Sequence, residues 1–269
     1  MQITVLADNF SIGQFRAEFG LALFIEHNSR RILFDTGAGS ALPENLKIAG
    51  IAPEEIKEVI LSHGHSDHTG GLSILAPEKI FASRAVTDGH FSLHADGSVH
   101  DINMPQTSKE VLAKSDCCFI DKFTDIGGGL SLSGYIPRIS TEDCGGNFFH
   151  DSSCTQVDNI DDEIFLLSSD GILISGCCHA GIINSLSHAK ALRPEIKIHT
   201  IIGGLHLRHA STERLQETAA FIKENSVKNL YLMHCTGENA IEKLRNLLPD
   251  CNIYTPVAGE SIMLAAKNR

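Results

Sequence analysis

The chain has 269 residues, of which 42% are hydrophobic and none is tryptophan, a composition ordinary for a globular protein. Its formal charge of −11 disfavours partners with a phosphate backbone, so we expect no nucleic-acid substrate. No apolar run approaches the roughly 18 residues of a membrane-spanning helix. The N-terminus MQITVLADNF begins directly as a strand, with neither a basic region nor a cleavage site. These features predict a cytoplasmic protein without a membrane partner.

The length predicts one domain over residues 1–269 with an inserted lobe. The 8 cysteines include two vicinal pairs and no C-x-x-C, so we expect neither a secreted disulfide framework nor a zinc ribbon or redox pair.

The first elements form a hairpin and a helix. Alternating and β-branched residues predict strands at 2–7, 20–26 and 31–35, with a turn at Asn28 and Ser29. A helix is expected at 40–50. Asp35 follows the third strand in LFDTG. That residue alone fits two interpretations equally well, an Asp that begins a turn or a carboxylate that fixes the tautomer of a metal-binding imidazole.

The densest chemistry lies in LSHGHSDHTGG at 61–71, directly after a short apolar strand predicted at 58–62. A strand sends side chains i and i+2 to the same face, so His63 and His65 are expected to point together. Asp67 and His68 follow after a turn and approach from another direction. Imidazoles with a carboxylate suit zinc best and iron or manganese acceptably, so one or two ions are predicted. A loop of solvated histidines is the alternative.

The glycines of this motif, at positions 64, 70 and 71, are expected to let the backbone turn tightly beside the ions.

The middle of the chain is irregular. A strand at 79–82 precedes residues 84–140, which mix Gly, Ser, Asp and His with short strand-like runs at 116–120 and 130–134. We expect this segment to be a lobe over the active site whose loops select the substrate. The interpretation favoured for His90, His94 and His100 is that they are solvated or face the substrate, because their spacing fits no common ligand pattern.

The second half repeats the design of a strand that ends at a histidine. Strands at 163–167 and 171–175, joined by the turn SSDG, lead into ISGCCHAGIINSL, where His179 precedes a helix. His179 is the best ligand candidate outside the first motif, with a capping or core histidine as the alternative. The free N–H groups of that helix N-terminus favour a bound anion such as phosphate.

Two further histidines follow strands. A strand at 196–202 leads to His206, which either contacts the substrate, acts as a further ligand or is structural. After a helix at 211–225, a strand at 229–233 ends at His234 in LMHCTG. A helix at 238–248 and two short strands complete the chain.

The pattern H-x-H-x-D-H after an apolar strand resembles the signature of the metallo-β-lactamase superfamily. The resemblance implies an α/β (α+β) fold, a four-layer αββα sandwich with metal ions at one edge. It also implies that Asp35 supports a ligand and that His234 is the last ligand. In many members the second-half hairpin ends in Gly-Asp, and the Asp bridges two ions. Here Cys177 follows Gly176, so Cys177 is either a thiolate ligand or an inert thiol beside a weak second site.

Several motifs narrow the resemblance to one branch. FDTG, LSHGHSDHTGGL, the IPR at 136–138, SGCCHAGIIN, IGGLHL and MHCTG occur in the order found in relatives of 7,8-dihydropterin-6-methyl-4-(β-D-ribofuranosyl)aminobenzene-5′-phosphate synthase. These motifs are specific for the branch and not for the substrate. Thr141 and Glu142 stand where relatives commonly have Phe-Glu, which weakens the transfer of substrate identity.

The expected function is that of a metal-dependent hydrolase acting through a metal-bound water on a small phosphorylated or ester-type substrate. One ion is assigned to His63, His65 and His179, and a second to Asp67, His68 and His234. Asp67 doubles as general base if its metal site is empty. The first alternative is a dihydropterin synthase-like transferase that displaces pyrophosphate, and the second is an iron-dependent redox protein.

Overall fold

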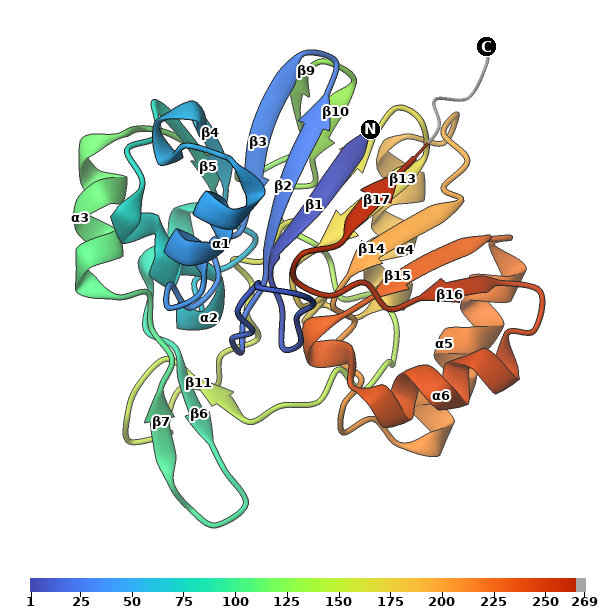
Figure 1. Cartoon of the computed structure of the whole chain (residues 1–269). Coiled ribbons are helices and arrows are strands. Elements are labelled where there is room, and N and C mark those ends of the chain that lie inside the picture. Colours follow the sequence, from blue (N-terminus) through green and yellow to red (C-terminus); the bar gives the residue numbers. More distant parts are fainter. Residues whose placement is uncertain (265–269) are drawn as a thin grey trace. The chain divides into compact units, whose positions relative to one another are not determined.

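The computed structural model describes residues 1–264 and divides the chain into two compact units (Figure 1). Unit 1 comprises residues 1–121, 146–162 and the segment from 256, and unit 2 comprises 122–145 and 163–255. Each unit has its own seven-stranded sheet and its own helices, so the mixed α/β class is confirmed. The segment 84–140 is shared between the units at residue 121, and its role as a lobe of one domain stays a prediction.

The sheet of unit 1 has the order β17-β1-β2-β3-β4-β5-β8. Its first four strands pair antiparallel, and from β3 onward the pairs are parallel. Asn28 and Ser29 both have positive φ, which confirms the predicted tight hairpin turn. The strands are β1 (Gln2–Ala7), β2 (Ala22–His27), β3 (Arg30–Phe34), β4 (Glu58–Ile60), β5 (Lys79–Ala82), β8 (Asp116–Phe119) and β17 (Ser261–Met263).

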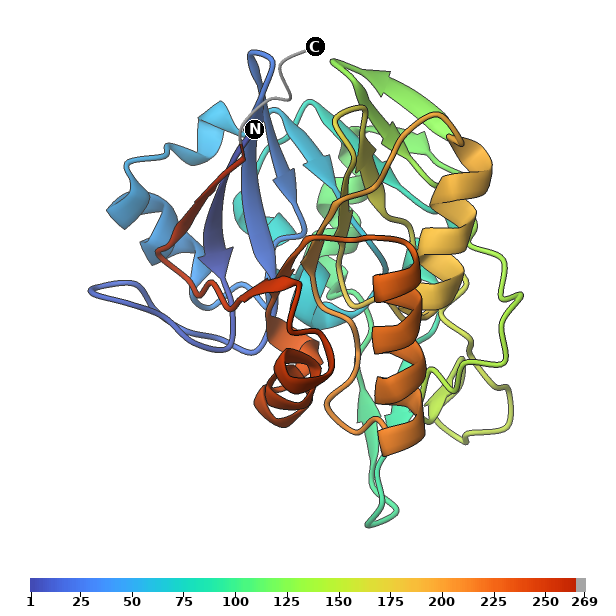
Figure 2. The ribbon, with the colours of Figure 1, turned by 90° about the vertical axis from the view of Figure 1, so that its right-hand side faces the viewer.

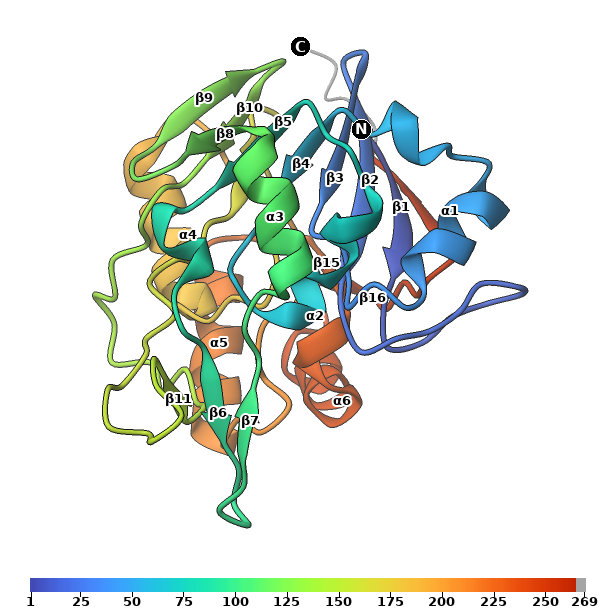
Figure 3. The same cartoon turned by 90° about the vertical axis from the view of Figure 1, so that its left-hand side faces the viewer.

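Helices α1 (Leu42–Ala49) and α3 (Gln106–Lys114) cover one face of this sheet (Figure 3). Leu46 of α1 and Leu112 of α3 enter a core with Leu33 and Ile80 of the strands. The sequence analysis did not predict α3, because only two of its residues are bulky and apolar. Short helical turns complete this unit: η1 (Pro53–Glu55), α2 (Ser66–Thr69), η2 (Gly70–Ile74) and η3 (Arg84–Thr87).

A small third sheet belongs to unit 1. It has the order β11-β6-β7, and its hairpin of β6 and β7 projects from the rest of the unit (Figure 1). The strands are β6 (Phe91–Leu93), β7 (Val99–Asp101) and β11 (Phe148–Phe149). They were not predicted, since strands of two or three residues are too short to give a periodic signal.

The sheet of unit 2 has the order β16-β15-β14-β13-β12-β10-β9. β13, β14, β15 and β16 run parallel, so the carboxyl ends of these strands lie at one edge. The predicted SSDG turn joins the antiparallel pair β12 and β13. The strands are β9 (Thr124–Gly127), β10 (Leu130–Leu132), β12 (Leu166–Ser168), β13 (Ile172–Ser175), β14 (Thr200–Gly203), β15 (Asn229–Leu232) and β16 (Asn252–Tyr254).

Three helices pack on one face of this second sheet: α4 (Ile182–Leu192), α5 (Thr212–Glu224) and α6 (Glu238–Leu247) (Figure 2). Leu186, Ile222 and Leu244, one from each helix, join the core formed with the strands. Ser211 caps α5, because its hydroxyl accepts a hydrogen bond from the Arg214 amide. Within residues 1–264, no helix is long and apolar enough to cross a membrane.

Close backbone approach explains the glycines that end the first histidine motif. Neither Gly70 nor Gly71 has a left-handed backbone, so the expectation that they serve the turn itself is wrong. A Cβ atom at Gly71 would lie 2.1 Å from the Thr36 carbonyl oxygen, and one at Gly70 would lie 2.2 Å from that of Ala38. These glycines therefore let the loop after the motif pack on the segment that follows β3.

We predict that Gly71→Ala lowers the free energy of unfolding by about 2 kcal/mol or more, because backbone must move to admit the methyl group. Ser73→Ala, on the exposed side of the same turn, should change it by less than about 0.5 kcal/mol. Chemical denaturation of both variants measures the difference. If the two variants had equal free energies of unfolding, the loop would be able to admit the methyl group without cost, which would contradict the prediction.

Candidate metal centre

Three imidazoles of unit 1 lie close together after β4. The ring centroids of His63 and His65 are 4.5 Å apart, and those of His63 and His68 are 4.3 Å apart. All three residues are buried. The strand ends at Ile60, however, so the expected strand geometry through residue 62 is wrong. Bends at residues 62–64 and the short helix α2 bring the rings together instead.

A hydrogen-bond chain orients two of these rings. Asp35, fully buried, accepts hydrogen bonds from His68 Nδ1, from the Ser62 amide and from the Ser62 hydroxyl, each at 2.7 Å. The Ser62 hydroxyl lies 2.8 Å from His63 Nδ1, and because its single proton goes to Asp35, it must accept the His63 Nδ1 proton. Both Nδ1 atoms therefore carry protons, and both Nε2 atoms hold their lone pairs ready for a cation.

His65 and Asp67 complete this half of the cluster. Burial lowers the pKa of His65 to about 3, against the opposing charge of Asp67, so its imidazole is neutral at physiological pH. A neutral ring is the form that binds metal. The Asp67 carboxylate lies 3.8 Å from His68 Nε2 and keeps 19% of its side chain exposed. Asp67 is thus placed to act as a ligand or as a base.

A buried ion pair supports the same loop. The Gly64 amide donates to Asp162 at 2.6 Å, while His90 Nδ1 lies 2.6 Å from Asp158 and His90 Nε2 lies 3.7 Å from Asp162. The His90 ring also packs edge-on against His65, with centroids 5.1 Å apart. The expectation that His90 is solvated or faces substrate is therefore wrong, since it is buried within unit 1.

The other two histidines of that segment agree with the interpretation of solvated residues. His94 and His100 are exposed on the hairpin of β6 and β7, where their rings stack at 4.1 Å.

In unit 2, three loops at the carboxyl ends of β13, β14 and β15 carry the remaining candidates. Within this unit, ligand atoms of Cys177, His179 and His206 lie within 4.8 Å of one another, as do those of Cys177, His234 and Cys235. The rings of His179 and His206 are 4.4 Å apart. His206 and His234 both have left-handed backbones, with φ of 48° and 52°. Such conformations are strained for non-glycine residues and cluster at functional sites.

Arginines hold the backbone of each of these histidines. Arg138 donates to the carbonyl of His179 at 2.9 Å, and Arg214 donates to that of His206 at 3.0 Å. Arg208 reaches the carbonyl of the third, His234, at 3.4 Å. Arg138 belongs to the IPR motif, but nothing in the spacing of the three arginines along the sequence predicts that each binds a histidine carbonyl.

Carboxylates of the chain itself fill the N-terminus of α4, so the expectation of a phosphate there is wrong. Glu163 accepts from the amides of His179 and Ala180 at 2.6 and 2.8 Å. Glu142 accepts a hydrogen bond from the Ile183 amide at 3.1 Å. A Cβ atom at Gly181 would lie 2.2 Å from Glu142 Oε2. Burial raises the pKa of both carboxyl groups, against these amide hydrogen bonds. A substrate anion would have to displace one of them.

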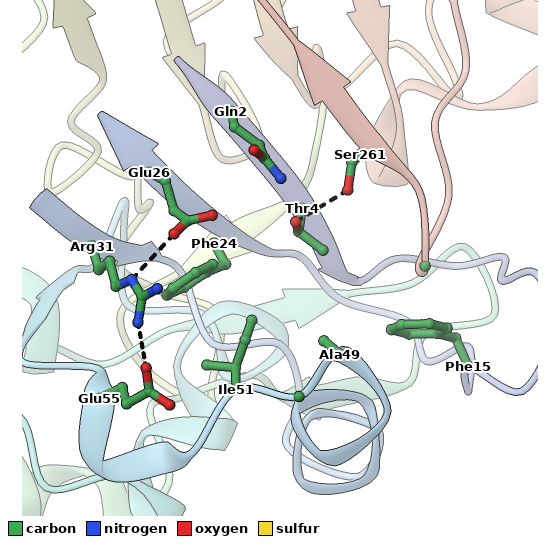
Figure 4. Close-up of a pocket in the computed structure, with 12 residues that line it drawn as sticks. Gln2, Thr4, Phe15, Phe24, Glu26, Arg31, Ala49, Ile51, Glu55 and Ser261 are labelled. Atoms are coloured by element: carbon green, nitrogen blue, oxygen red, sulfur yellow. Dashed lines mark hydrogen bonds and ion pairs between the residues drawn. The ribbon is translucent and has the colours of Figure 1, made fainter. Parts of the chain in front are cut away.

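A cavity of about 360 Å³ elsewhere in unit 1 carries no such chemistry (Figure 4). Its charged groups already pair, since Arg31 binds both Glu26 and Glu55, and Thr4 contacts Ser261. Neither histidine, cysteine nor aspartate lines it. The lining residues are Gln2, Thr4, Phe15, Phe24, Glu26, Arg31, Ala49, Gly50, Ile51, Glu55, Gly259 and Ser261.

Comparison with known proteins settles the family. The model of the metallo-beta-lactamase superfamily matches residues 16–148. An uncharacterized protein of Methanocaldococcus jannaschii, MJ0448, is 32% identical over 252 residues, which cover 91% of this chain and 94% of that protein. The chain belongs to the metallo-β-lactamase superfamily. The resemblance inferred from the histidine motif is thereby confirmed.

Two further relatives of this superfamily member carry functional descriptions. The 7,8-dihydropterin-6-methyl-4-(beta-D-ribofuranosyl)-aminobenzene-5′-phosphate synthase of M. jannaschii is 30% identical over 268 residues, covering 89% of each chain. A solved structure described as Tm1679, a metal-dependent hydrolase of the beta-lactamase superfamily, is 27% identical, with a TM-score of 0.85 over 98% of this chain and 99% of that one. The fold of the superfamily is therefore confirmed for nearly the whole chain.

The donor sets fit a divalent cation. Unit 1 offers imidazole nitrogens with a carboxylate, and unit 2 offers imidazoles with thiols, which are the ligand types of zinc and other borderline metals. The sequence predicted these ligand candidates except Cys235, but it did not predict Ser62, Asp158 or Asp162, which support the histidine loop of unit 1. The only available signal was the acidic run DNIDDE at 158–163, which has no recognised spacing.

We predict that Asp35→Asn weakens zinc binding by about 10- to 100-fold, because an amide has one acceptor oxygen where Asp35 uses two. In either orientation its NH₂ group faces a donor, either the Ser62 amide or the His68 ring and Ser62 hydroxyl. Asparagine tolerates the left-handed backbone of Asp35, at φ 58°, so the fold should persist. Competition with a chromophoric chelator measures the affinity, and Asp116→Asn, at an exposed carboxylate, is the control. An unchanged zinc affinity of Asp35→Asn would show that Asp35 does not orient the ligands.

A second prediction concerns the ion pair below the loop. Burial opposes the charge of His90, but Asp158 and Asp162, with a smaller contribution from Asp88, outweigh it and raise the His90 pKa. Because the folded pKa lies above the unfolded value of about 6.5, the pair stabilises the protein fully below that pH. This contribution is lost as the pH rises through the folded pKa.

His90→Gln should therefore cost more stability at about pH 6 than at about pH 9. Denaturant titrations at both pH values measure the difference, and His94→Gln on the exposed hairpin should show almost none. A cost for His90→Gln that is independent of pH would mean that packing alone explains this histidine.

Proposed function

We propose that the chain is a metal-dependent hydrolase of a small phosphorylated or ester-type substrate. The observation that carries this proposal is the hydrogen-bond chain from Asp35 through Ser62 to His63 and His68, which fixes two imidazole tautomers for metal binding. The Nε2-unprotonated tautomer fixed in this way is the form of imidazole that coordinates a cation through Nε2. The description of the similar structure Tm1679 as a metal-dependent hydrolase supports the same class.

The ligand assignment follows the family resemblance. One ion is assigned to His63, His65 and His179, and a second to Asp67, His68 and His234. Zinc is the proposed metal, with iron or manganese as substitutes, and one or two ions are compatible with the donor types. A bound divalent cation lowers the pKa of a coordinated water towards neutrality and polarises the bond to be cleaved.

The residues of the chain supply orientation and proton transfer. Asp35 holds the His68 ring. Asp67, partly exposed, is a ligand when the second ion is bound, and it accepts the proton of the attacking water as general base when that metal site is empty. His206, whose backbone is held by Arg214 and Cys235, is assigned to substrate contact. The strain at His206 is consistent with a side chain aimed for function.

The substrate is proposed to be a small molecule. The negative charge of the chain disfavours nucleic acid, and the carboxylates at α4 leave no room there for a phosphate. Any phosphate of the substrate must then be bound by other groups, such as the metal.

A dihydropterin synthase-like transferase is the second candidate. The 30% identity to the M. jannaschii synthase over 89% of both chains favours it. In this reaction an aryl amine or aryl carbon takes the place of water and displaces pyrophosphate. The departure at Thr141 and Glu142, where relatives commonly have Phe-Glu, argues against the same substrate.

The test is a panel of phosphomonoesters, phosphodiesters, carboxylic esters and lactones, together with a pterin pyrophosphate supplied with an aryl amine. We expect hydrolysis that a chelator abolishes and that added zinc, iron or manganese restores. Asp67→Asn should lower the rate by about 100-fold or more, whereas Asp125→Asn, at an exposed carboxylate, should not. A coupled pterin product without hydrolysis would establish the transferase instead, and absence of metal-dependent turnover on all substrates would reject both.

A further inference from the structure

Two thiols and an imidazole lie together inside unit 2. Ligand atoms of Cys177, His234 and Cys235 are all within 4.8 Å of one another, and the three residues are 3–6% exposed. Cys177 follows β13, while His234 and Cys235 are consecutive in η4 (His234–Thr236), after β15. The parallel neighbours β13, β14 and β15 thus bring the three donors to one sheet edge from distant parts of the sequence.

The loop after β14 is shaped around the Cys235 sulfur. A Cβ atom at Gly204 would lie 2.5 Å from Cys235 Sγ and 2.6 Å from the Gly176 carbonyl oxygen. Only glycine therefore leaves space for the sulfur between the loops. The Leu205 amide donates to the Thr236 hydroxyl at 3.1 Å, which joins this loop to η4. The Cys235 sulfur lies beside the His206 amide and the Cys177 carbonyl.

Backbone polar groups are directed at this sulfur. The His206 amide donates to Cys235 Sγ at 3.3 Å, and the Cys235 thiol donates to the Cys177 carbonyl at 3.5 Å. An amide N–H directed at sulfur favours the thiolate, which is the form that binds metal. His234, directly before Cys235, has a left-handed backbone with φ of 52°. The strain of this conformation needs a compensating interaction.

We propose that Cys177, Cys235 and His234 form a thiolate-containing cation site within unit 2. Two sulfurs and one imidazole are the ligands of tetrahedral zinc with one open position. The site would select Zn²⁺, Co²⁺ or Fe²⁺ over Mg²⁺, Ca²⁺ and Mn²⁺, because thiolates are soft donors. This inference rests on the proposed function, since His234 belongs to both ligand sets. It removes manganese from the metals proposed to bind at this position.

X-ray absorption at the zinc edge tests the proposal on the unaltered protein. The chain is stripped of metal, kept reduced with a phosphine so that both sulfurs stay thiols, and loaded to saturation with Zn²⁺. We expect sulfur scatterers at about 2.3 Å in addition to nitrogen or oxygen at about 2.0–2.1 Å. A shell of nitrogen and oxygen alone would overturn the proposal.

Co²⁺ binding assigns the sulfurs. The Co²⁺-loaded protein should show a sulfur-to-cobalt charge-transfer band in the near ultraviolet. Cys177→Ser and Cys235→Ser should each remove about half of this band, and the double variant should lose it entirely. Cys251→Ser, a half-buried cysteine near β16, is the matched control and should keep the full band. A band that survives in the double variant would contradict the proposal even if zinc shows sulfur ligation.

The two proposals fail separately. Metal-dependent hydrolysis with a shell free of sulfur would keep the proposed function and reject the thiolate site. Sulfur ligation without turnover of the substrate panel would do the reverse. In His63→Ala/His65→Ala, which removes donors of unit 1 only, the charge-transfer band should remain while hydrolysis is lost.

Discussion

The fixed protonation of His63 and His68 is the constraint on which the rest of this account depends. Asp35 is a buried carboxylate with a left-handed backbone, and both features are costly unless its hydrogen bonds are complete. Its two oxygens are satisfied by Ser62 and His68, and Ser62 passes the constraint on to His63. One carboxylate after β3 thus sets the donor atoms of two rings that follow β4, and parallel pairing of those strands puts them in reach.

In unit 2 the histidines are positioned through their backbone carbonyls, whereas in unit 1 they are positioned through their rings. Arg138, Arg214 and Arg208 each bind the carbonyl of a strand-end histidine. Two of those histidines adopt conformations that cost about 1–3 kcal/mol each, so the arginines and the buried carboxylates must over-determine the loops. In both units the candidate ligands lie on short loops at the edge of a rigid sheet. Hydrogen bonds from charged side chains hold these loops in place.

Sequence predicted the elements whose signals are periodic or dense. β1 and β5 have the expected bounds, the remaining core strands and the helices α1, α5 and α6 differ only at their ends, and HGHSDH identified the superfamily. It could not predict α3, which has only two bulky apolar residues, nor β9 and the hairpin of β6 and β7, whose strands of three or four residues are too short to show periodicity. His90 was misjudged because its partners Asp158 and Asp162 lie about 70 residues away, and the α4 N-terminus was misjudged because Glu142 and Glu163 are brought there only by tertiary structure. Candidate metal ligands can be recognised in a sequence by their residue type and spacing, whereas the groups that orient them cannot.

The most direct measurement is anomalous diffraction from crystals of the protein purified without added metal, with data collected on both sides of the absorption edges of zinc, iron and manganese. The account predicts an anomalous peak within bonding distance, about 2.0–2.2 Å, of His63 Nε2, with the Nδ1 atom of His68 still bound to Asp35. A structure with no peak there, even after soaking in Zn²⁺, or with His63 and His68 turned so that Nδ1 faces the cation, would contradict it.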